Sequence, residues 1–194
     1  MFPLPEGIIM ALEWDGERDA SAYMGTSFSC YFRPGEAVEL ICKDVLAPTK
    51  TAGQAFANTT LVIRGSDEGV PDKAGVFDNT MIIDRRLWSA LEAELDHMKS
   101  RRAATTPLFR RRTDYYNRRL GEGAKALGLR DEDVEDLFLY ILRHGGAASE
   151  LLEKVRDFRE VRDRGWRHTD MTVKRYCAEY RRSLKCSISW ASPA

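Results

Sequence analysis

An arginine at the end of an apolar run is the side chain of this sequence that most needs a partner. The stretch LYILRHGGAASELL, residues 139–152, places Arg143 and His144 after the largely apolar residues 139–142 and before Gly145-Gly146, which would allow close packing behind the arginine. Arginine is almost never fully buried unless something pairs with it. Either an acid elsewhere in the fold neutralises Arg143, or an anionic ligand does.

Three more polar signals accompany Arg143. Arg33 lies in YFRPGE, and Lys73 lies in PDKAG between two β-branched runs. The late stretch RGWRHTDMTVKRYCAEY contains Trp166, Arg167, His168, Tyr176 and Tyr180. Taken singly, each has an ordinary structural reading: an ion pair of Arg33 with Glu36, a solvated lysine, or aromatic residues at the edge of a core.

Charge is divided unevenly along a chain whose formal net charge is zero. Residues 1–97 carry 8 Lys/Arg against 16 Asp/Glu, whereas residues 98–194 carry 22 against 14. Clustered cations gain from the release of a nucleic acid's counterions, so the basic half points to a polyanionic partner. A charge run taken alone is more often a solvated surface, and that alternative stays open. The candidate phosphate contacts lie in segments 101–119 and 154–185: Arg101, Arg102, Arg110, Arg111, Arg112, Arg167, Lys174 and Arg175.

The order and context of these signals resemble the catalytic domain of tyrosine recombinases, the phage-integrase family, in a divergent integrase-like branch. YFRPGEAVEL resembles the first family box, LRHGGAASELL the second, and RGW the Gly-His/Trp motif. The resemblance extends from about residue 20 to residue 182. It implies a mostly helical α+β integrase-like fold with a small antiparallel β-hairpin or sheet, and site-specific DNA integration or recombination.

The resemblance also implies a role for each matched residue. Two arginines, Arg33 and Arg143, would hold the non-bridging oxygens of the phosphate, a task suited to guanidinium forks. Lys73 would protonate the leaving 5′ oxygen, and Trp166 would help to position the phosphate. Tyr176 would be the nucleophile that forms a 3′-phosphotyrosine, so that neither a cofactor nor a metal is required. Glu36 takes the place of the structural acid, and His144 that of the residue that usually follows the second arginine.

Two features depart from the family pattern. Tyr140 stands three residues before Arg143, where the family usually has His or Lys as an acid or base, and a phenol with a pKa near 10 is a poor base at neutral pH. The spacing from Trp166 to Tyr176 is one residue longer than the common pattern. Arg167 or His168 is therefore an alternative phosphate donor, and Tyr180 is an alternative nucleophile.

Periodicity predicts the elements that must position these residues. In the first part of the chain, helices are expected over 21–32, beginning near Arg33 and beginning at Arg85. Further along, they are expected from residue 109 or 113 to 127, beginning at the acidic stretch RDEDVED, and over 137–152, 158–164 and 170–184. Ala37, Val38, Leu40 and Ile41 are expected to point inward, as are Leu87, Trp88, Leu91 and Leu95. The β-branched runs at 59–65 and 79–85 predict a hairpin with a long tip, and residues 44–54 and 100–107 are expected to be loops.

Composition places the chain among ordinary intracellular proteins. It has 194 residues, 43% of them hydrophobic and 31% charged, with no run of eighteen apolar residues and no basic leader at the N-terminus. No C-x-x-C pair occurs among the four cysteines, Cys30, Cys42, Cys177 and Cys186, so they are expected to be reduced thiols. The three histidines lack the spacing of metal ligands, so no metal site is expected. The expected location is the nucleus in a eukaryote and otherwise the cytoplasm or nucleoid.

We therefore expect an N-terminal extension at 1–19, a catalytic domain at 20–184 and a tail at 185–194, whether in a fragment, a domain of a longer protein or a minimal enzyme. The predicted partners are double-stranded DNA and further copies of the chain on that DNA, as a dimer or tetramer, with no membrane. The tail, with Trp190, either docks on a neighbouring subunit or is a disordered end. The alternatives are a catalytically impaired DNA-binding domain, a type IB topoisomerase-like enzyme, and a helical interaction module in which the arginines form structural ion pairs.

Overall fold

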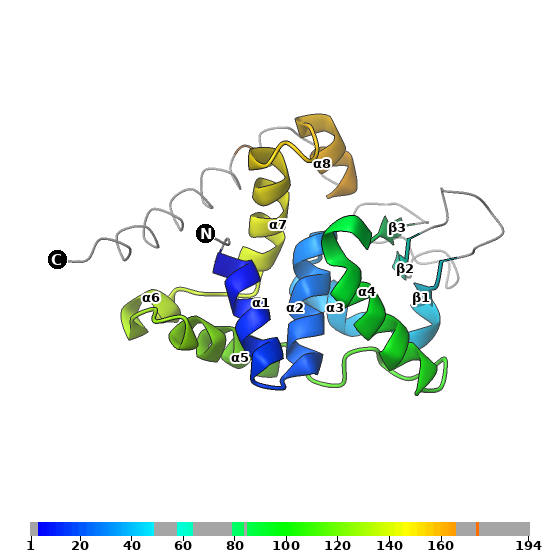
Figure 1. Ribbon diagram of the computed structural model, residues 1–194, viewed down its shortest axis with the longest axis horizontal. Coiled ribbons are helices and arrows are strands. Elements are labelled where there is room, and N and C mark those ends of the chain that lie inside the picture. Colours follow the sequence, from blue (N-terminus) through cyan, green and yellow to red (C-terminus); the bar gives the residue numbers. More distant parts are fainter. Residues whose placement is uncertain (1–3, 49–57, 64–78, 84, 166–173, 175–194) are drawn as a thin grey trace. The chain divides into compact units, whose positions relative to one another are not determined.

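The computed structural model describes residues 4–48, 58–63, 79–83, 85–165 and 174 (Figure 1). The chain divides into two compact units. The first consists of Met1–Pro34 and Arg111–Ala194, and the second of Gly35–Arg110. The first unit is therefore discontinuous in sequence, with the second unit inserted between its two parts.

The elements described in the first unit are all helices. Its helices are α1 (Leu4–Trp14), α2 (Arg18–Cys30), α5 (Thr113–Ala126), α6 (Asp131–Glu135), α7 (Tyr140–Leu152) and α8 (Phe158–Arg164). Helix α1 packs against α2 and α5, and α2 packs against α7 (Figure 1). Buried side chains of α1 and α2 such as Ile8, Leu12, Tyr23 and Phe28 fill this core.

Helix α2 is enclosed on nearly all sides, since every residue from Ala20 to Phe32 is buried. Its partner α7 approaches closely at Gly146, where a methyl group would overlap the carbonyl oxygen of Phe28. Only a residue without a Cβ allows this backbone contact. The expectation that glycine permits close packing behind Arg143 is confirmed at Gly146.

The second unit holds a small sheet. After α3 (Pro34–Glu39), whose residues from Gly35 onward belong to this unit, come the 3-10 helix η1 (Cys42–Asp44) and strands β1 (Val45–Leu46), β2 (Thr60–Ile63) and β3 (Asn79–Ile82). The strands pair antiparallel in the order β1-β2-β3. Val45 faces Leu61, which faces Met81, and all three side chains are buried. One face of the sheet is thus its apolar face.

The predicted pairing of the two β-branched runs is confirmed by β2 and β3. The loop expected over 44–54 is wrong at Val45–Leu46, which form β1. A two-residue strand is too short to show an alternating pattern, so the sequence carried no signal for it. Residues 49–57 and the hairpin tip at 64–78 lie outside the described residues.

Helix α4 (Arg85–Ser100) follows the sheet and is kinked at Trp88, whose φ of −132° and ψ of 40° are not helical. Its buried Glu92 accepts hydrogen bonds from the Thr59 amide and hydroxyl at 3.2 and 3.0 Å. Lys99 Nζ donates to the Val45 carbonyl at 2.5 Å. The helix is therefore hydrogen-bonded at two points to the sheet region, at the first residue of β1 and at the residue before β2.

Most predicted helices are confirmed, with small shifts at their ends. Helix α8 has the predicted bounds, α2 begins and ends earlier than predicted, and α7 begins at Tyr140. Gly128, with a φ of 89°, closes α5 as expected, and acids fill the first turn of α6. Of the residues expected to point inward, Ala37, Leu40, Leu91 and Leu95 are buried, whereas Val38, Ile41 and Trp88 are half-buried. The side chain of Leu87 and most of the predicted helix at 170–184 lie outside the description.

Among the described residues, no helix combines the length and the apolar character needed to cross a membrane. The same part of the chain contains no group of three or more His, Cys, Asp or Glu side chains arranged to hold a metal ion.

Candidate functional site

Arg143, on α7, is 3% exposed, and its guanidinium binds the ends of two other helices. Nη1 donates to the carbonyl oxygen of Tyr31, the residue that ends α2. Nη2 donates at 3.0 Å to the carbonyl oxygen of Gly165, the residue that ends α8. The last carbonyls of a helix lack intrahelical partners and carry partial negative charge, so a cation is stabilised there.

These partners bear on the two explanations given for a buried arginine, a neutralising acid or an anionic ligand. The two acceptors described here are backbone carbonyls, which satisfy N–H groups of the guanidinium and carry no formal charge. They also fix the plane of the guanidinium in the fold. Such a group suits the positioning of an anion, because its direction is set before the anion arrives.

The same two bonds bring Arg143 to the backbone beside other candidates. Tyr31 lies two residues before Arg33, whose side chain is exposed, and Gly165 immediately precedes Trp166 in the chain. One buried guanidinium therefore holds the start of the segment that carries Arg33 and the last described residue before the RGW tryptophan.

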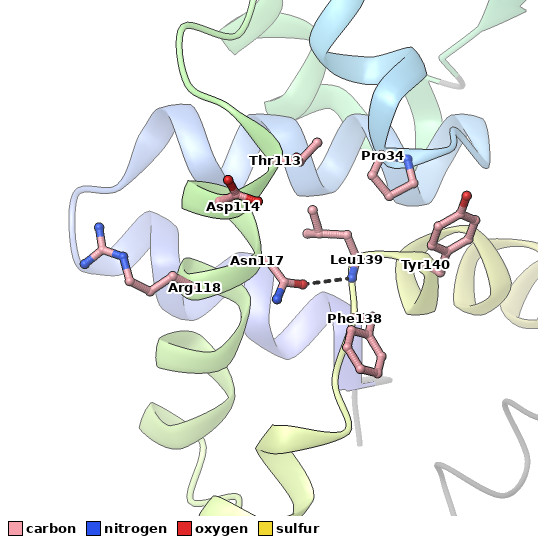
Figure 2. A pocket seen from close by; sticks show the side chains of 8 residues that line it. All are labelled: Pro34, Thr113, Asp114, Asn117, Arg118, Phe138, Leu139 and Tyr140. Carbon is pink, nitrogen blue, oxygen red and sulfur yellow. Dashed lines mark hydrogen bonds between the residues drawn. The ribbon is translucent and has the colours of Figure 1, made fainter.

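Tyr140 lines a surface pocket together with Pro34, the residue that follows Arg33. Figure 2 shows an open pocket lined by Pro34 together with residues of α5 and of the start of α7: Thr113, Asp114, Asn117, Arg118, Phe138, Leu139 and Tyr140. The Asn117 side-chain oxygen accepts from the Leu139 amide at 3.3 Å and so helps to fix the start of α7 (Figure 2). The Tyr140 ring is 49% exposed, and it lines the same pocket as the residue that follows Arg33.

The remaining candidates fall into two groups. Glu36, in the first turn of α3, and His144, one turn after Tyr140, are both half-buried, and the His144 and Tyr140 ring centroids are 6.3 Å apart. Lys73, Trp166, Arg167, His168, Arg175, Tyr176 and Tyr180 lie outside the described residues. The roles given to this second group stay predictions.

Most of the predicted phosphate contacts are exposed. In the second unit Arg101 and Arg110 are exposed, and Arg102 is half-buried with Nη1 donating to the Leu108 carbonyl at 2.5 Å. In the first unit Arg111, Arg112 and Lys174 are exposed.

Basic charge continues from Arg111 into α5. The guanidiniums of Arg111 and of Arg118 and Arg119 on α5 lie 5.3 to 5.5 Å from the centre of the Tyr115 ring. Arg119 also pairs with Glu17 at 2.7 Å and with Glu122 at 2.6 Å. The basic face of α5 is therefore partly neutralised by neighbouring acids.

A buried polar network around Tyr31 was not predicted. The Tyr31 hydroxyl donates to Glu150 Oε2, and Arg156 forms an ion pair with Oε1 of the same carboxylate. Arg164 Nη2 donates at 2.9 Å to the Ser29 carbonyl, and its guanidinium lies 5.6 Å from the centre of the Tyr31 ring. Burial, followed by the charge of Glu150 and the hydrogen bond to it, raises the pKa of Tyr31, so the phenol keeps its proton.

One signal could have revealed part of this network. Glu150 follows Arg143 by seven residues, which is two helical turns, so both charged side chains lie on one face of α7. A charged pair on the buried face of a glycine- and alanine-rich helix indicates partners from other elements. Nothing in the sequence identified Tyr31 as one of them.

Comparison with known proteins supports the fold but gives little beyond it. The chain has a mostly helical α+β fold with a three-stranded antiparallel sheet, as expected of an integrase-like domain. No protein-family model matches the sequence, and no curated protein is significantly similar to it.

Among solved structures, the crystal structure of XerA recombinase, a tyrosine recombinase, matches with a TM-score of 0.61 and 18% sequence identity. The match covers 100% of this chain and 63% of the XerA chain. At this identity the likeness establishes a shared fold.

Proposed function

We propose that this chain is a tyrosine recombinase catalytic domain, which cuts and rejoins one DNA strand at a time through a covalent 3′-phosphotyrosine. The observation that carries the proposal is the placement of Arg143. It is buried and bound to two carbonyls beside the Arg33 segment, in a fold shared with XerA recombinase.

The proposed reaction conserves the phosphodiester bond energy. The oxygen of Tyr176 attacks the phosphorus as its own proton departs, and the bond from phosphorus to the 5′ oxygen breaks. Lys73 gives that oxygen a proton, while Arg33 and Arg143 hold the extra negative charge on the non-bridging oxygens. In the reverse step a 5′ hydroxyl attacks the phosphotyrosine and releases the tyrosine, so ligation needs no nucleotide.

Tyr140 would serve this site as a hydrogen-bond donor. Its ring is half-exposed at the pocket beside Pro34, which is a suitable place to touch a phosphate held by Arg33. A phenol donates a hydrogen bond at neutral pH but accepts a proton poorly. Proton removal from the nucleophile would then fall to another group or to water.

Duplex DNA is the proposed partner, with further copies of the chain assembled on it. The exposed Arg111 and Arg112 in one unit, and Arg101 and Arg110 in the other, would contact phosphates and position the duplex without reading its sequence.

The identity of Tyr140 favours one second candidate, a DNA-binding domain of the same fold that no longer cuts. Such a domain would keep the arginines and the basic surface but would form no covalent adduct. Two other classes give different results. A type IB topoisomerase-like enzyme would relax supercoils without pairing two sites, and a helical interaction module would bind DNA weakly, whether or not Arg33 and Arg143 were present.

The test is to incubate the protein with nicked suicide duplexes, which trap the covalent step because the cleaved fragment diffuses away. We expect an adduct that survives denaturant and is lost in Tyr176→Phe but kept in Tyr180→Phe. An adduct that survives Tyr176→Phe would contradict the nucleophile assignment. DNA binding without any adduct in the wild-type protein would favour the impaired domain.

A further inference from the structure

Tyr31 has a backbone conformation that its residue type does not favour. Its φ of 54° and ψ of 36° lie in the left-handed region, where the Cβ of an L-residue is crowded and glycine is the usual occupant. A bulky residue stays in such a conformation only when its surroundings impose it. The contacts that impose it here can be named.

The Tyr31 side chain is anchored along its whole length. It packs in a buried cluster with Ala147 and Val161, from α7 and α8. Arg164 lies over the ring, and the hydroxyl ends on the Glu150 carboxylate, whose other oxygen pairs with Arg156. The carbonyl of the same residue is the acceptor for Arg143 Nη1.

From this geometry we infer that Tyr31 is a positioning residue for Arg143, and that the Tyr31–Glu150 bond keeps the acceptor carbonyl directed at the guanidinium. The inference deepens the proposed function and rests on it for the catalytic consequence. Without the hydroxyl bond, Tyr31 is freer to relax toward ordinary right-handed torsions. Its carbonyl would then turn away, and Arg143 would lose the direction needed to meet a phosphate.

The chain offers a closely matched control at the other end of α2. Tyr116 is also fully buried, and its hydroxyl donates to a carboxylate, Asp19 Oδ2, at 2.6 Å. Burial raises its pKa as it does that of Tyr31, with further contributions from the carboxylate partner. Tyr116→Phe therefore removes the same kind of bond without touching the residues around Arg143. It also removes the bond that this hydroxyl accepts from the Arg111 amide at 3.3 Å.

The experiment compares full-length wild-type protein, Tyr31→Phe and Tyr116→Phe by two measurements. The first is the rate of adduct formation at saturating nicked duplex, alongside the melting temperature. We expect Tyr31→Phe to lower this rate about tenfold more than Tyr116→Phe does, the factor that one hydrogen bond represents, at a similar loss of melting temperature. Equal losses of rate would mean that Tyr31 serves stability alone and would overturn the inference.

The second measurement needs no DNA. Nitrogen-15 NMR of the arginine side chains should show separate, slowly averaged Nη–H signals for Arg143 in the wild-type protein and in Tyr116→Phe. The same signals should be averaged in Tyr31→Phe, and those of the exposed Arg159 should be averaged in all three proteins. Arg143 signals that stay separate in Tyr31→Phe would overturn the inference. A wild-type protein that forms no adduct would defeat the proposed function, and this measurement would still decide the role of Tyr31.

A second variant covers the case in which Tyr31→Phe does not fold. Arg164→Gln removes the guanidinium over the Tyr31 ring and its hydrogen bonds to Ser29 while leaving the hydroxyl bond in place. We expect partial averaging of the Arg143 signals and a smaller loss of adduct rate. Wild-type values in both measurements would count against the inference.

Discussion

The carbonyl of Tyr31 and the guanidinium of Arg143 are hydrogen-bonded across a separation of 112 residues. The bond fixes the end of α2 to α7 at the point where the chain turns toward Arg33. Both proposed catalytic arginines are therefore linked to this hydrogen bond. Arg143 is its donor, and Arg33 lies two residues after its acceptor, Tyr31.

This difference predicts a contrast between two substitutions. Arg143→Lys should lower the free energy of unfolding by about 1–3 kcal/mol, because lysine has one nitrogen in place of the Nη1 and Nη2 that donate to the two carbonyls, and a buried acceptor is left unsatisfied. Arg33→Lys, at an exposed position, should change it by less than about 0.5 kcal/mol. Urea denaturation measures both values, and both variants should lose adduct formation. If the two variants were equally stable, Arg143 would not have the structural part assigned to it.

Gly146 should not tolerate even one added methyl group. Gly146→Ala places a Cβ into the Phe28 carbonyl, and the helices must separate, which costs about 1–3 kcal/mol or more. Gly35→Ala is the control, since nothing lies near its Cβ position within 4 Å and alanine favours the helix by about 0.5–1 kcal/mol. Thermal melts should show a large fall for the first variant and no fall for the second. A stable Gly146→Ala protein would contradict the close approach of α7 to α2.

Cys30 should be unreactive in the folded protein. Burial is the main cause that raises its pKa to about 11, and the thiolate is the species that alkylates. The raised value contributes stability that is present below the unfolded pKa near 9 and is lost as the pH rises through about 11. Mass spectrometry after maleimide treatment at pH 8 should find Cys30 modified only when denaturant is added. Rapid labelling of the native protein would refute its burial.

Glu92 should be needed to hold the start of β2. Glu92→Ala removes the acceptor of both Thr59 hydrogen bonds and should lower the free energy of unfolding by about 2–3 kcal/mol, whereas Glu92→Gln retains an oxygen and should cost less. Hydrogen exchange at the Thr59 amide should accelerate in the alanine variant. Since β2 leads into the segment that carries Lys73, adduct formation should fall as well. An unchanged exchange rate would show that Glu92 is not the anchor.

Tyr140 offers a gain of function. Tyr140→His places a group with a pKa near 6.5 where a proton acceptor is expected, and the half-exposed site tolerates the change. The rate of adduct formation at pH 7.5 should rise by about tenfold or more and acquire a dependence on a group titrating near pH 6.5. Tyr140→Phe, the control, should not show this rise. A rate unchanged in Tyr140→His would place the proton acceptor elsewhere.

The sequence predicted elements better than it predicted contacts. Leu91 and Leu95 carried the period of α4, and the β-branched runs predicted β2 and β3, because a buried face repeats along the chain. Strand β1 is too short to repeat anything, and α1 was assigned no element although Ile8 and Leu12 are buried in the first unit. Local periodicity thus identified the longer amphipathic segments and missed the short ones.

The site shows the same limit. Arg143 was recognised because an arginine after an apolar run needs a partner, and its burial is confirmed. Its partners were not predictable, because a backbone carbonyl leaves no trace in the residue type of Tyr31 or Gly165. The left-handed turn at Tyr31 was equally hidden, since the residue expected at such a turn is glycine.

Because residues 35–110 are inserted between the two parts of the first unit, the second unit is synthesised before the first unit is complete. Helix α2 leaves the ribosome long before α7, yet nearly all of its surface is buried in the finished protein. The nascent chain must therefore carry α2 packed at most against α1, without its partners α5 and α7, while the second unit is made. Helix α2 is rich in small and hydroxyl-bearing residues, such as Ser21, Thr26, Ser27 and Ser29. These residues make it less prone to aggregate before α7 is synthesised.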